Sequence, residues 1–226
     1  MSDALLGVII GGTFGFLGAM LGILANTWLD ARRAKRERLR EVRLRLVGNQ
    51  VQTSEVLEFV KTHHREVDHK HEAGEAADLS RANLAQIDLR GESLVGVKFF
   101  RADLSNADLD YADLSFCDLS KANLANADLT GAKLHGAKLG WARLPHADLC
   151  KADLSDTKLS NVDFTHARLH EVNFTGADLT NADLTGADLT DSNITPEQLR
   201  QAKSTAGVLL SPGLQFSTPL AALSNN

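Results

Sequence analysis

Residues 102–116 read ADLSN ADLDY ADLSF, three consecutive groups of five in which Ala, Asp and Leu return at fixed places. The spacing continues in both directions, so that a large apolar residue stands at every fifth position from Leu79 to Ile194. Of these 24 central residues, 20 are Leu, three are Phe and one is Ile. A helix needs an apolar period near 3.6 and a strand a period of 2, so a strict period of five indicates a solenoid.

Polarity separates the inside of this solenoid from its outside. The residue two places before each central residue is small, and it is Ala at 16 of the 24 sites. Residues two apart in an extended segment point to the same side, so the small and central residues form the interior. The residue between them is Asp at 13 sites, Lys or Arg at six, Asn at four and Ser at one, which is typical of a solvated exterior. Glu92 places a carboxylate at an interior site, so we expect the early coils to be irregular there.

The last residue of each five predicts a corner. Gly and Asn tolerate a positive φ in a tight turn. They fill this place at ten sites: Gly91, Gly96, Asn106, Asn126, Gly131, Gly136, Asn161, Gly176, Asn181 and Gly186.

Groups such as 102–106 and 177–181 strongly resemble the pentapeptide-repeat family over about half of the chain. The resemblance implies an all-β solenoid, a right-handed quadrilateral β-helix with four fives to a coil. Residues 75–195 would then form about six coils. Burial of the central side chains predicts a rod that is stable without a metal, ligand or disulfide.

The last part of the chain, residues 196–226, predicts a capping helix and a tail. Thr195 is a suitable N-cap, Pro196 suits the first helical position and Gln198 completes a capping box. A short helix here would cover the open edge of the last coil. Beyond Leu210 the spacing of Pro and Gly indicates an extended tail.

The first part of the chain, residues 1–29, predicts a transmembrane anchor. Ala4 to Leu29 contain no charged residue over 26 positions, more than the roughly 20 needed to cross a bilayer. Eight basic residues follow the apolar run between Ala31 and Arg45, whereas a cleaved signal peptide carries its basic residues before the run. The positive-inside bias therefore predicts a single-pass protein of the bacterial cytoplasmic membrane, with the repeats in the cytoplasm.

Glycines in the anchor could bring two such helices together. Gly7, Gly11 and Gly15 recur every four residues on one helix face, with Gly18 and Gly22 beside them, a pattern that allows close helix pairing. Glycine is also common in spanning helices in general, so the prediction of a homo-oligomer stays open.

Residues 30–74 predict a basic helical stalk and a linker. From Asp30 to about Glu66 the composition is helical, and Leu39, Val42, Leu46, Val56 and Val60 fit a heptad spacing with polar residues at two core positions. A short coiled coil through the stalk would also give a homo-oligomer. An amphipathic helix on the membrane surface fits equally well.

The sequence predicts no catalytic, cofactor or metal site. His63, His64, His69 and His71 cluster in the linker, but no two of them are spaced i,i+4, and solvated histidines explain them better than a metal does. Cys117 stands at an interior site and Cys150 at an exterior one on the opposite wall, which excludes a disulfide between them. Motifs for nucleophilic, phosphate-binding, dinucleotide-binding and zinc-protease chemistry are missing from the sequence, so we expect a protein that is not an enzyme.

Residues 20 apart would stack on one wall, which gives the rod two oppositely charged sides although the net charge of the chain is only −5. The candidate acidic wall is made of Asp88, Asp108, Asp110, Asp128, Asp148 and Asp188. The candidate basic and aromatic wall opposite it is made of Arg81, Arg101, Lys121 and Trp141. Stacked carboxylates repel one another, and binding a basic partner would offset this, although such columns can also serve solubility alone.

Two functions remain open on these grounds. The first is a membrane-tethered scaffold, in which the rod binds a protein partner on the cytoplasmic side and makes no direct contact with nucleic acid. The second comes from the family resemblance, because some pentapeptide-repeat proteins protect DNA gyrase by imitating duplex DNA. Against the second, a duplex carries one charge per about 1.7 Å, several times denser than one carboxylate per coil.

Overall fold

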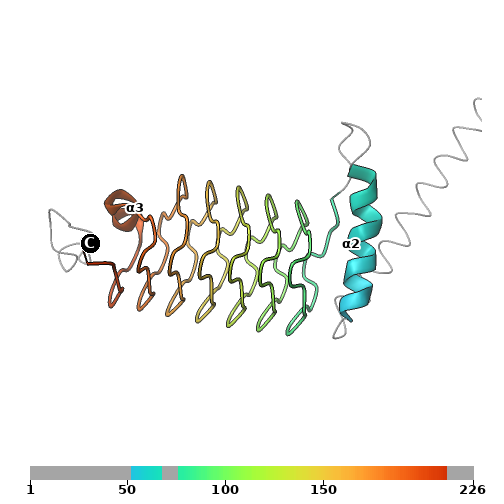
Figure 1. Ribbon diagram of the computed structural model, residues 1–226, viewed down its shortest axis with the longest axis horizontal. Coiled ribbons are helices and arrows are strands. Elements are labelled where there is room, and N and C mark those ends of the chain that lie inside the picture. The colour runs from blue at the N-terminus through green and yellow to red at the C-terminus, as the bar shows by residue number, and fades with distance from the viewer. Residues whose placement is uncertain (1–51, 68–75, 213–226) are drawn as a thin grey trace, which may run out of the picture. The chain divides into compact units, whose positions relative to one another are not determined.

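The computed structural model describes residues 52–67 and 76–212, which all belong to one compact unit, Arg45–Asn226 (Figure 1). Within these residues the helices are α2 (Thr53–Val67) and α3 (Pro196–Gln201). From Asp78 onward, the repeats pair through isolated parallel bridges of single residues and do not form extended strands. The predicted anchor at residues 1–29 and the basic part of the stalk lie outside the described residues. No helix among the residues described has the length and apolar character needed to cross a bilayer.

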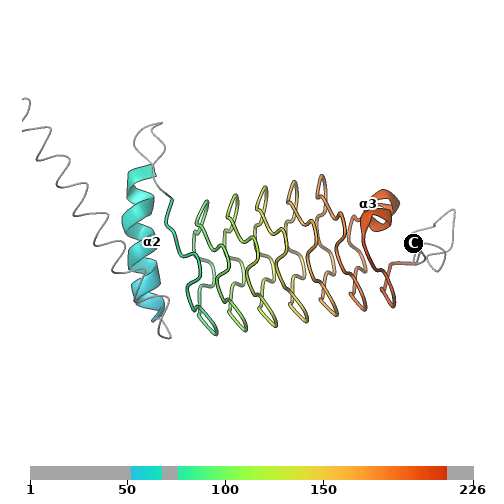
Figure 2. The same cartoon turned by 180° about the vertical axis from the view of Figure 1, so that it is seen from behind.

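Each coil of the rod contains four groups of five, because the bridges join residues 20 apart, such as Asp88 to Asp108 and Asp108 to Asp128. Residues 78 to 194 therefore make the six coils that the sequence predicts, and Figure 2 shows the same stack from behind. We number the walls from one to four in chain order. In the first coil their outward residues are Asp78, Asn83, Asp88 and Ser93.

The backbone explains why a five-residue unit favours Asp or Asn at its outward site. In residues 103–107 the amide of Asp103 donates to the coil before, at Ala82 O (2.9 Å), and the amides of Leu104 and Asn106 donate to the coil after. The amide of Ala107 closes the turn onto Leu104 O (3.1 Å). The fifth amide, of Ser105, donates to the Asp103 carboxylate (3.1 Å). All five amides thus have acceptors, as a closely packed backbone requires.

The interior is formed by the residues that the sequence assigns to it. All 24 central side chains are at most 2% exposed, and the small residues beside them are mostly buried as well. Polar atoms at small-residue sites are satisfied locally: Thr157 Oγ1 donates to Leu154 O (2.6 Å) and Cys117 Sγ to Leu94 O (2.9 Å).

The expected irregularity at Glu92 is not found. The Glu92 carbonyl accepts from Asp113 N (2.9 Å), and Ser93 pairs with Asp113 as its equivalents do elsewhere. The Glu92 side chain is partly exposed, so its carboxylate is not enclosed in the core and the coil keeps its regular path.

Every corner between residues 81 and 191 has a positive φ, at 23 successive places five apart. The ten predicted Gly and Asn corners are confirmed. The remaining 13 corners carry other residues, including Tyr111, Phe116 and Trp141, although a left-handed conformation costs roughly 1–2 kcal/mol with such side chains. The closed coil imposes this geometry on whatever residue stands there. We number each corner by the wall that precedes it.

Helix α3 begins as predicted and is followed by more of the solenoid. The capping box is present, since Gln198 N donates to Thr195 Oγ1 (3.2 Å) and Thr195 N to Gln198 Oε1 (2.9 Å). Gln198 Nε2 also donates to Phe174 O (2.7 Å) and Ala177 O (3.1 Å) of the coils below. Parallel pairing then continues beyond the predicted boundary at residue 195, from Asp183 to Ser204 and from Asp188 to Leu209. The described part of the tail is therefore a partial seventh coil.

Helix α2 accounts for the last part of the predicted stalk. Gln52 is not helical, so the helix expected from Asp30 is not continuous through this point. Val56 and Val60, which the heptad spacing places on one face, are buried together with Phe59. The rest of the predicted coiled coil lies outside the described residues.

Candidate interaction surfaces

The predicted acidic wall is the third wall, and its column is confirmed by bridges that run through Asp88, Asp108, Asp128 and Asp148. Arginines of the same wall neutralise much of it. Arg90 lies 2.8 Å from the Asp88 carboxylate and 3.2 Å from that of Asp108. Arg168, the next residue in the column, pairs with Asp148. The third wall is therefore less acidic than its aspartate count indicates.

All 13 outward aspartates also have a structural role that sequence reasoning missed. Each accepts the amide two residues ahead, as Asp128 does from Thr130 (2.9 Å) and Asp188 from Thr190 (3.1 Å). Asp is common in turns because its side chain accepts a backbone amide in this way. The number of aspartates is therefore no measure of a binding surface.

Among the described residues, Asp110 and Asp128 of the third wall lie in no ion pair, and Arg90 acts on Asp110 only through its charge, without a hydrogen bond. Desolvation raises the pKa of Asp110 above its ordinary value, and the neighbouring Asp128 and Asp108 carboxylates raise it further. A cation brought to this place would stabilise the charged form of Asp110.

Two exposed aromatic rings stand beside this place, and sequence reasoning did not single them out. Tyr111 at the third corner is 64% exposed and Phe116 at the fourth corner is 60% exposed. Each lies against a glycine one coil later: a Cβ on Gly131 would meet Tyr111 Cε1 at 2.5 Å, and one on Gly136 would meet Phe116 Cε1 at 2.7 Å. The rings therefore flank the fourth wall of the second coil at its two edges. The signal in the sequence was an aromatic at a corner site with glycine 20 residues later.

The predicted basic and aromatic residues also form one column, at the first corner. The amides of Arg81, Arg101 and Lys121 donate to the following coil at 2.9, 3.1 and 3.0 Å, which places these residues and Trp141 one above another. All four side chains are exposed, and Trp141 is 62% exposed. Because they stand at a corner, they form a projecting edge. We call this set the basic ridge.

The two histidines that lie near hydroxyl and carboxylate groups do not make a catalytic relay, for different reasons. His135 Nδ1 is 3.0 Å from Ser155 Oγ and 3.8 Å from the Asp156 carboxylate. A general base takes a proton on one ring nitrogen while the acid holds the other, and at His135 both groups face the same nitrogen. At His170 they face different nitrogens, with Nδ1 2.9 Å from Thr190 Oγ1 and Nε2 2.9 Å from the Glu171 carboxylate. The Thr190 hydroxyl, however, donates its proton to Asp188 (2.7 Å) and not to the imidazole.

The cysteines lie as the sequence assigns them, except that Cys150 is only 9% exposed. Both are free thiols. Burial raises the pKa of Cys117 to about 12 and that of Cys150 to about 11. Neither is therefore an activated nucleophile at neutral pH.

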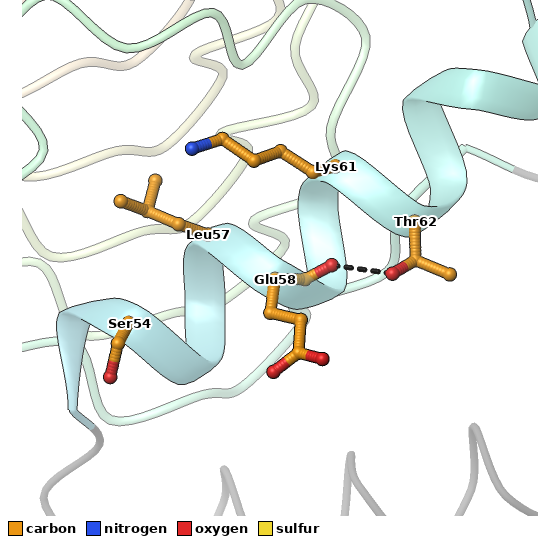
Figure 3. Close-up of a pocket in the computed structure, with 5 residues that line it drawn as sticks. All are labelled: Ser54, Leu57, Glu58, Lys61 and Thr62. Atoms are coloured by element: carbon orange, nitrogen blue, oxygen red, sulfur yellow. Dashed lines mark hydrogen bonds between the residues drawn. The ribbon is translucent and has the colours of Figure 1, made fainter.

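In the part of the chain described, no three His, Cys, Asp or Glu side chains converge as metal ligands would. The cluster of His63, His64, His69 and His71, and the glycines Gly7, Gly11, Gly15, Gly18 and Gly22, lie outside the residues whose side chains are described. A depression on α2 is lined by five residues of that helix alone: Ser54, Leu57, Glu58, Lys61 and Thr62 (Figure 3). Its polar groups do not converge on a common point, and Thr62 Oγ1 donates to the backbone oxygen of Glu58 (2.6 Å).

Comparison with known proteins supports the fold. The family model for pentapeptide repeats matches residues 77–113, 107–144, 132–170 and 157–195 in eight copies, more than half of the chain. No curated protein sequence matches the chain significantly.

Solved structures of similar fold include a trypsin-treated form of QnrB1, a plasmid-mediated fluoroquinolone resistance protein, with 22% identity over 59% of this chain and 77% of that one and a TM-score of 0.54. A thylakoid-lumen pentapeptide repeat protein of Arabidopsis thaliana is 32% identical over 49% of this chain and 74% of its own, with a TM-score of 0.36. HetL of Nostoc sp. strain PCC 7120 is 26% identical over 59% and 74%, with a TM-score of 0.32. The family model and the likeness to QnrB1 indicate a right-handed quadrilateral β-helix.

Proposed function

Because this chain belongs to the pentapeptide-repeat family, we propose that it is a non-enzymatic binding module, tethered to the membrane by residues 1–29, whose rod holds a protein partner on the cytoplasmic side. The tether is supported by the 26 uncharged positions before the basic segment. The rod supports the binding role because its walls are rigid and its core is filled by its own side chains.

The exposed pair Tyr111 and Phe116 is the observation that carries this proposal. Aromatic residues are enriched where proteins bind one another, because they give a large contact area with little loss of side-chain entropy. Both rings stand in a backbone conformation that disfavours them, and both are mostly exposed. Phe116 also packs edge to face against His135, with the ring centroids 5.2 Å apart, but both rings keep most of their surface open to a partner. Asp110 and Asp128 beside Tyr111 favour a partner that presents basic side chains.

Imitation of duplex DNA is less well supported. The bridges through Asp148, Arg168 and Asp188 interrupt the acidic column with a cation, and Arg90 neutralises its first two carboxylates. A gyrase-binding role would need a denser and continuous row of negative charge. The likeness to QnrB1, at 22% identity, concerns the fold.

Partner capture with variants of the full chain tests the proposal. Asn accepts a positive φ, so Tyr111→Asn with Phe116→Asn removes the rings and leaves the corners intact. Trp141→Asn is the matched control, since it removes an equally exposed aromatic from a distant corner. We expect a saturable partner that binds the wild type and the control but not the double variant. Retention by the double variant, or no saturable partner under several growth conditions, would refute the proposal.

A further inference from the structure

We propose that the basic ridge, Arg81, Arg101, Lys121 and Trp141, lies against the surface of an anionic lipid bilayer. This inference deepens the proposed function and rests on its membrane tether for how the rod reaches the bilayer. The rod would then lie along the membrane on its first corner.

Among the described residues, no carboxylate pairs with the three stacked cations of the ridge. They occupy the same corner of consecutive coils, which are about 4.8 Å apart. None of them lies in an ion pair within residues 52–67 and 76–212. The Arg101 guanidinium lies over the Phe100 ring, 5.3 Å from the ring centroid. Like charges so close repel one another, and an external anionic surface would relieve the repulsion.

Like charges are also stacked on the third wall, but there residues of the chain itself neutralise them. There Arg90 and Arg168 lie directly against the stacked carboxylates. The acidic residues near the ridge do not neutralise its cations in the same manner. Asp103 accepts hydrogen bonds from Ser105 N and Asn123 Nδ2, and Asp118 accepts one from Ser120 N. Neither Asp103 nor Asp118 lies in an ion pair with a cation of the ridge among the described residues, so the ridge keeps its positive charge.

Two further cations, Lys98 and Lys138, strengthen the field around the ridge. They belong to the first wall, on either side of Asp118 in its column, and both are exposed. The first four coils of this edge therefore carry more positive than negative groups. Each Lys or Arg near an anionic membrane adds about 1 kcal/mol of attraction, a factor of roughly five in affinity.

Trp141 distinguishes a bilayer from a nucleic acid as the partner. An indole with an apolar body and one polar N–H suits the boundary between head groups and acyl chains. A projecting edge can rest on a flat surface, whereas a duplex bound through its phosphates gains nothing from an exposed indole. Trp141 stands directly after Lys121 in the column, so cations and indole would meet the bilayer together.

The placement also leaves Tyr111 open to a partner, while Phe116 stands at the fourth corner, between Tyr111 and the ridge. The first and third corners are diagonally opposite in a four-sided coil. When the ridge faces the bilayer, Tyr111 at the third corner points away from it, toward the cytoplasm. One edge of the rod would serve the membrane and the opposite edge the protein partner.

Fluorescence quenching by brominated lipids tests the contact in the full chain. The chain has two Trp residues, so Trp28→Phe leaves Trp141 as the single reporter. A second reporter at the opposite corner is made by Trp28→Phe, Trp141→Phe and Tyr111→Trp, which keeps an aromatic ring in the ridge. Vesicles contain brominated phosphatidylcholine, either alone or with an equal part of phosphatidylglycerol. We expect strong quenching of Trp141 only with phosphatidylglycerol present and at low salt, and no quenching of the reporter at position 111.

Charge variants show whether the ridge itself is responsible. Arg81→Asn, Arg101→Asn and Lys121→Asn keep residues that accept a positive φ, and the triple variant should weaken the anionic-lipid contact about 100-fold. The control, Lys133→Gln, Lys151→Asn and Arg168→Gln, makes the same charge change on other faces and should leave quenching unaltered. Equal quenching of both reporters, equal loss in both triple variants, or a response of Trp141 to duplex DNA and not to anionic vesicles would overturn the inference.

Flotation of the vesicles separates this inference from the tether. Chain that floats in both lipid mixtures while Trp141 stays unquenched supports the tether and refutes the ridge contact. Chain that does not float in phosphatidylcholine alone refutes the tether. In that case the ridge contact is still supported if the chain binds phosphatidylglycerol vesicles in a salt-sensitive manner and Trp141 is quenched. If the chain does not bind these vesicles, the ridge contact is refuted as well.

Discussion

Replacing corner glycines by Ala provides a direct test of how the two aromatic rings are held. Gly91 and Gly131 occupy the same corner, with φ of 65° and 63°, but only Gly131 lies against Tyr111. Gly91→Ala should cost only the left-handed strain, about 1–2 kcal/mol. Gly131→Ala adds a Cβ at 2.5 Å from Tyr111 Cε1, which must push the ring out of its rotamer at a further cost of roughly 0.5–1.5 kcal/mol. The same comparison can be made at the fourth corner, where Gly136 lies against Phe116 and Gly96 has no atom within 4 Å of an added Cβ.

Thermal unfolding of the full chain, followed by circular dichroism, measures the difference. At this size 1 kcal/mol corresponds to about 2–4 °C in Tm, so Gly131→Ala should melt a few degrees below Gly91→Ala. Adding Tyr111→Asn should abolish the difference, because the added Cβ then meets no ring. Equal melting temperatures for the two single variants, or a difference that survives Tyr111→Asn, would show that Tyr111 is not held against Gly131.

Further outcomes follow from the core, the turns, the thiols and the charges. Leu129→Ala, at a fully buried site, should cost about 2–5 kcal/mol in urea unfolding, and a cost below 1 kcal/mol would contradict the filled core. Asp128→Ala should cost about 0.5–1.5 kcal/mol by removing the acceptor for Thr130 N, while Asp128→Asn should cost less than about 0.5 kcal/mol; equal costs would show that the turn bond is unimportant. Because the pKa values of Cys150 and Cys117 are raised to about 11 and about 12, alkylation by iodoacetamide at pH 8 should be about 100-fold slower in the native protein than after denaturation and should accelerate as the pH rises; equal rates would contradict the burial. Micromolar protein should neither inhibit nor protect gyrase supercoiling, and either effect would revive the DNA-imitating function.

Much of the rod could be predicted because its period is short and its side chains have simple roles. The central Leu residues, the small residues beside them and the glycine corners were all assigned correctly from spacing and polarity. The partial seventh coil was missed because its residues depart from the pattern: Lys203 and Thr205 flank Ser204 where Ala and Leu are expected, and Leu209 stands at an outward site and is 57% exposed. Helix α3 also shifts the pairing distance there from 20 residues to 21.

By itself, the sequence determined which residues face inward, since a repeat that places Ala and Leu two apart leaves one side apolar in every unit. It also determined the start of α3, because a capping box is a local interaction. Only the tertiary structure decided which charges remain free. Arg90 and Arg168 neutralise the acidic wall, whereas Arg81, Arg101 and Lys121 have no ion pair in the described part of the chain. This difference depends on side-chain contacts between and within coils, which the column order alone does not specify.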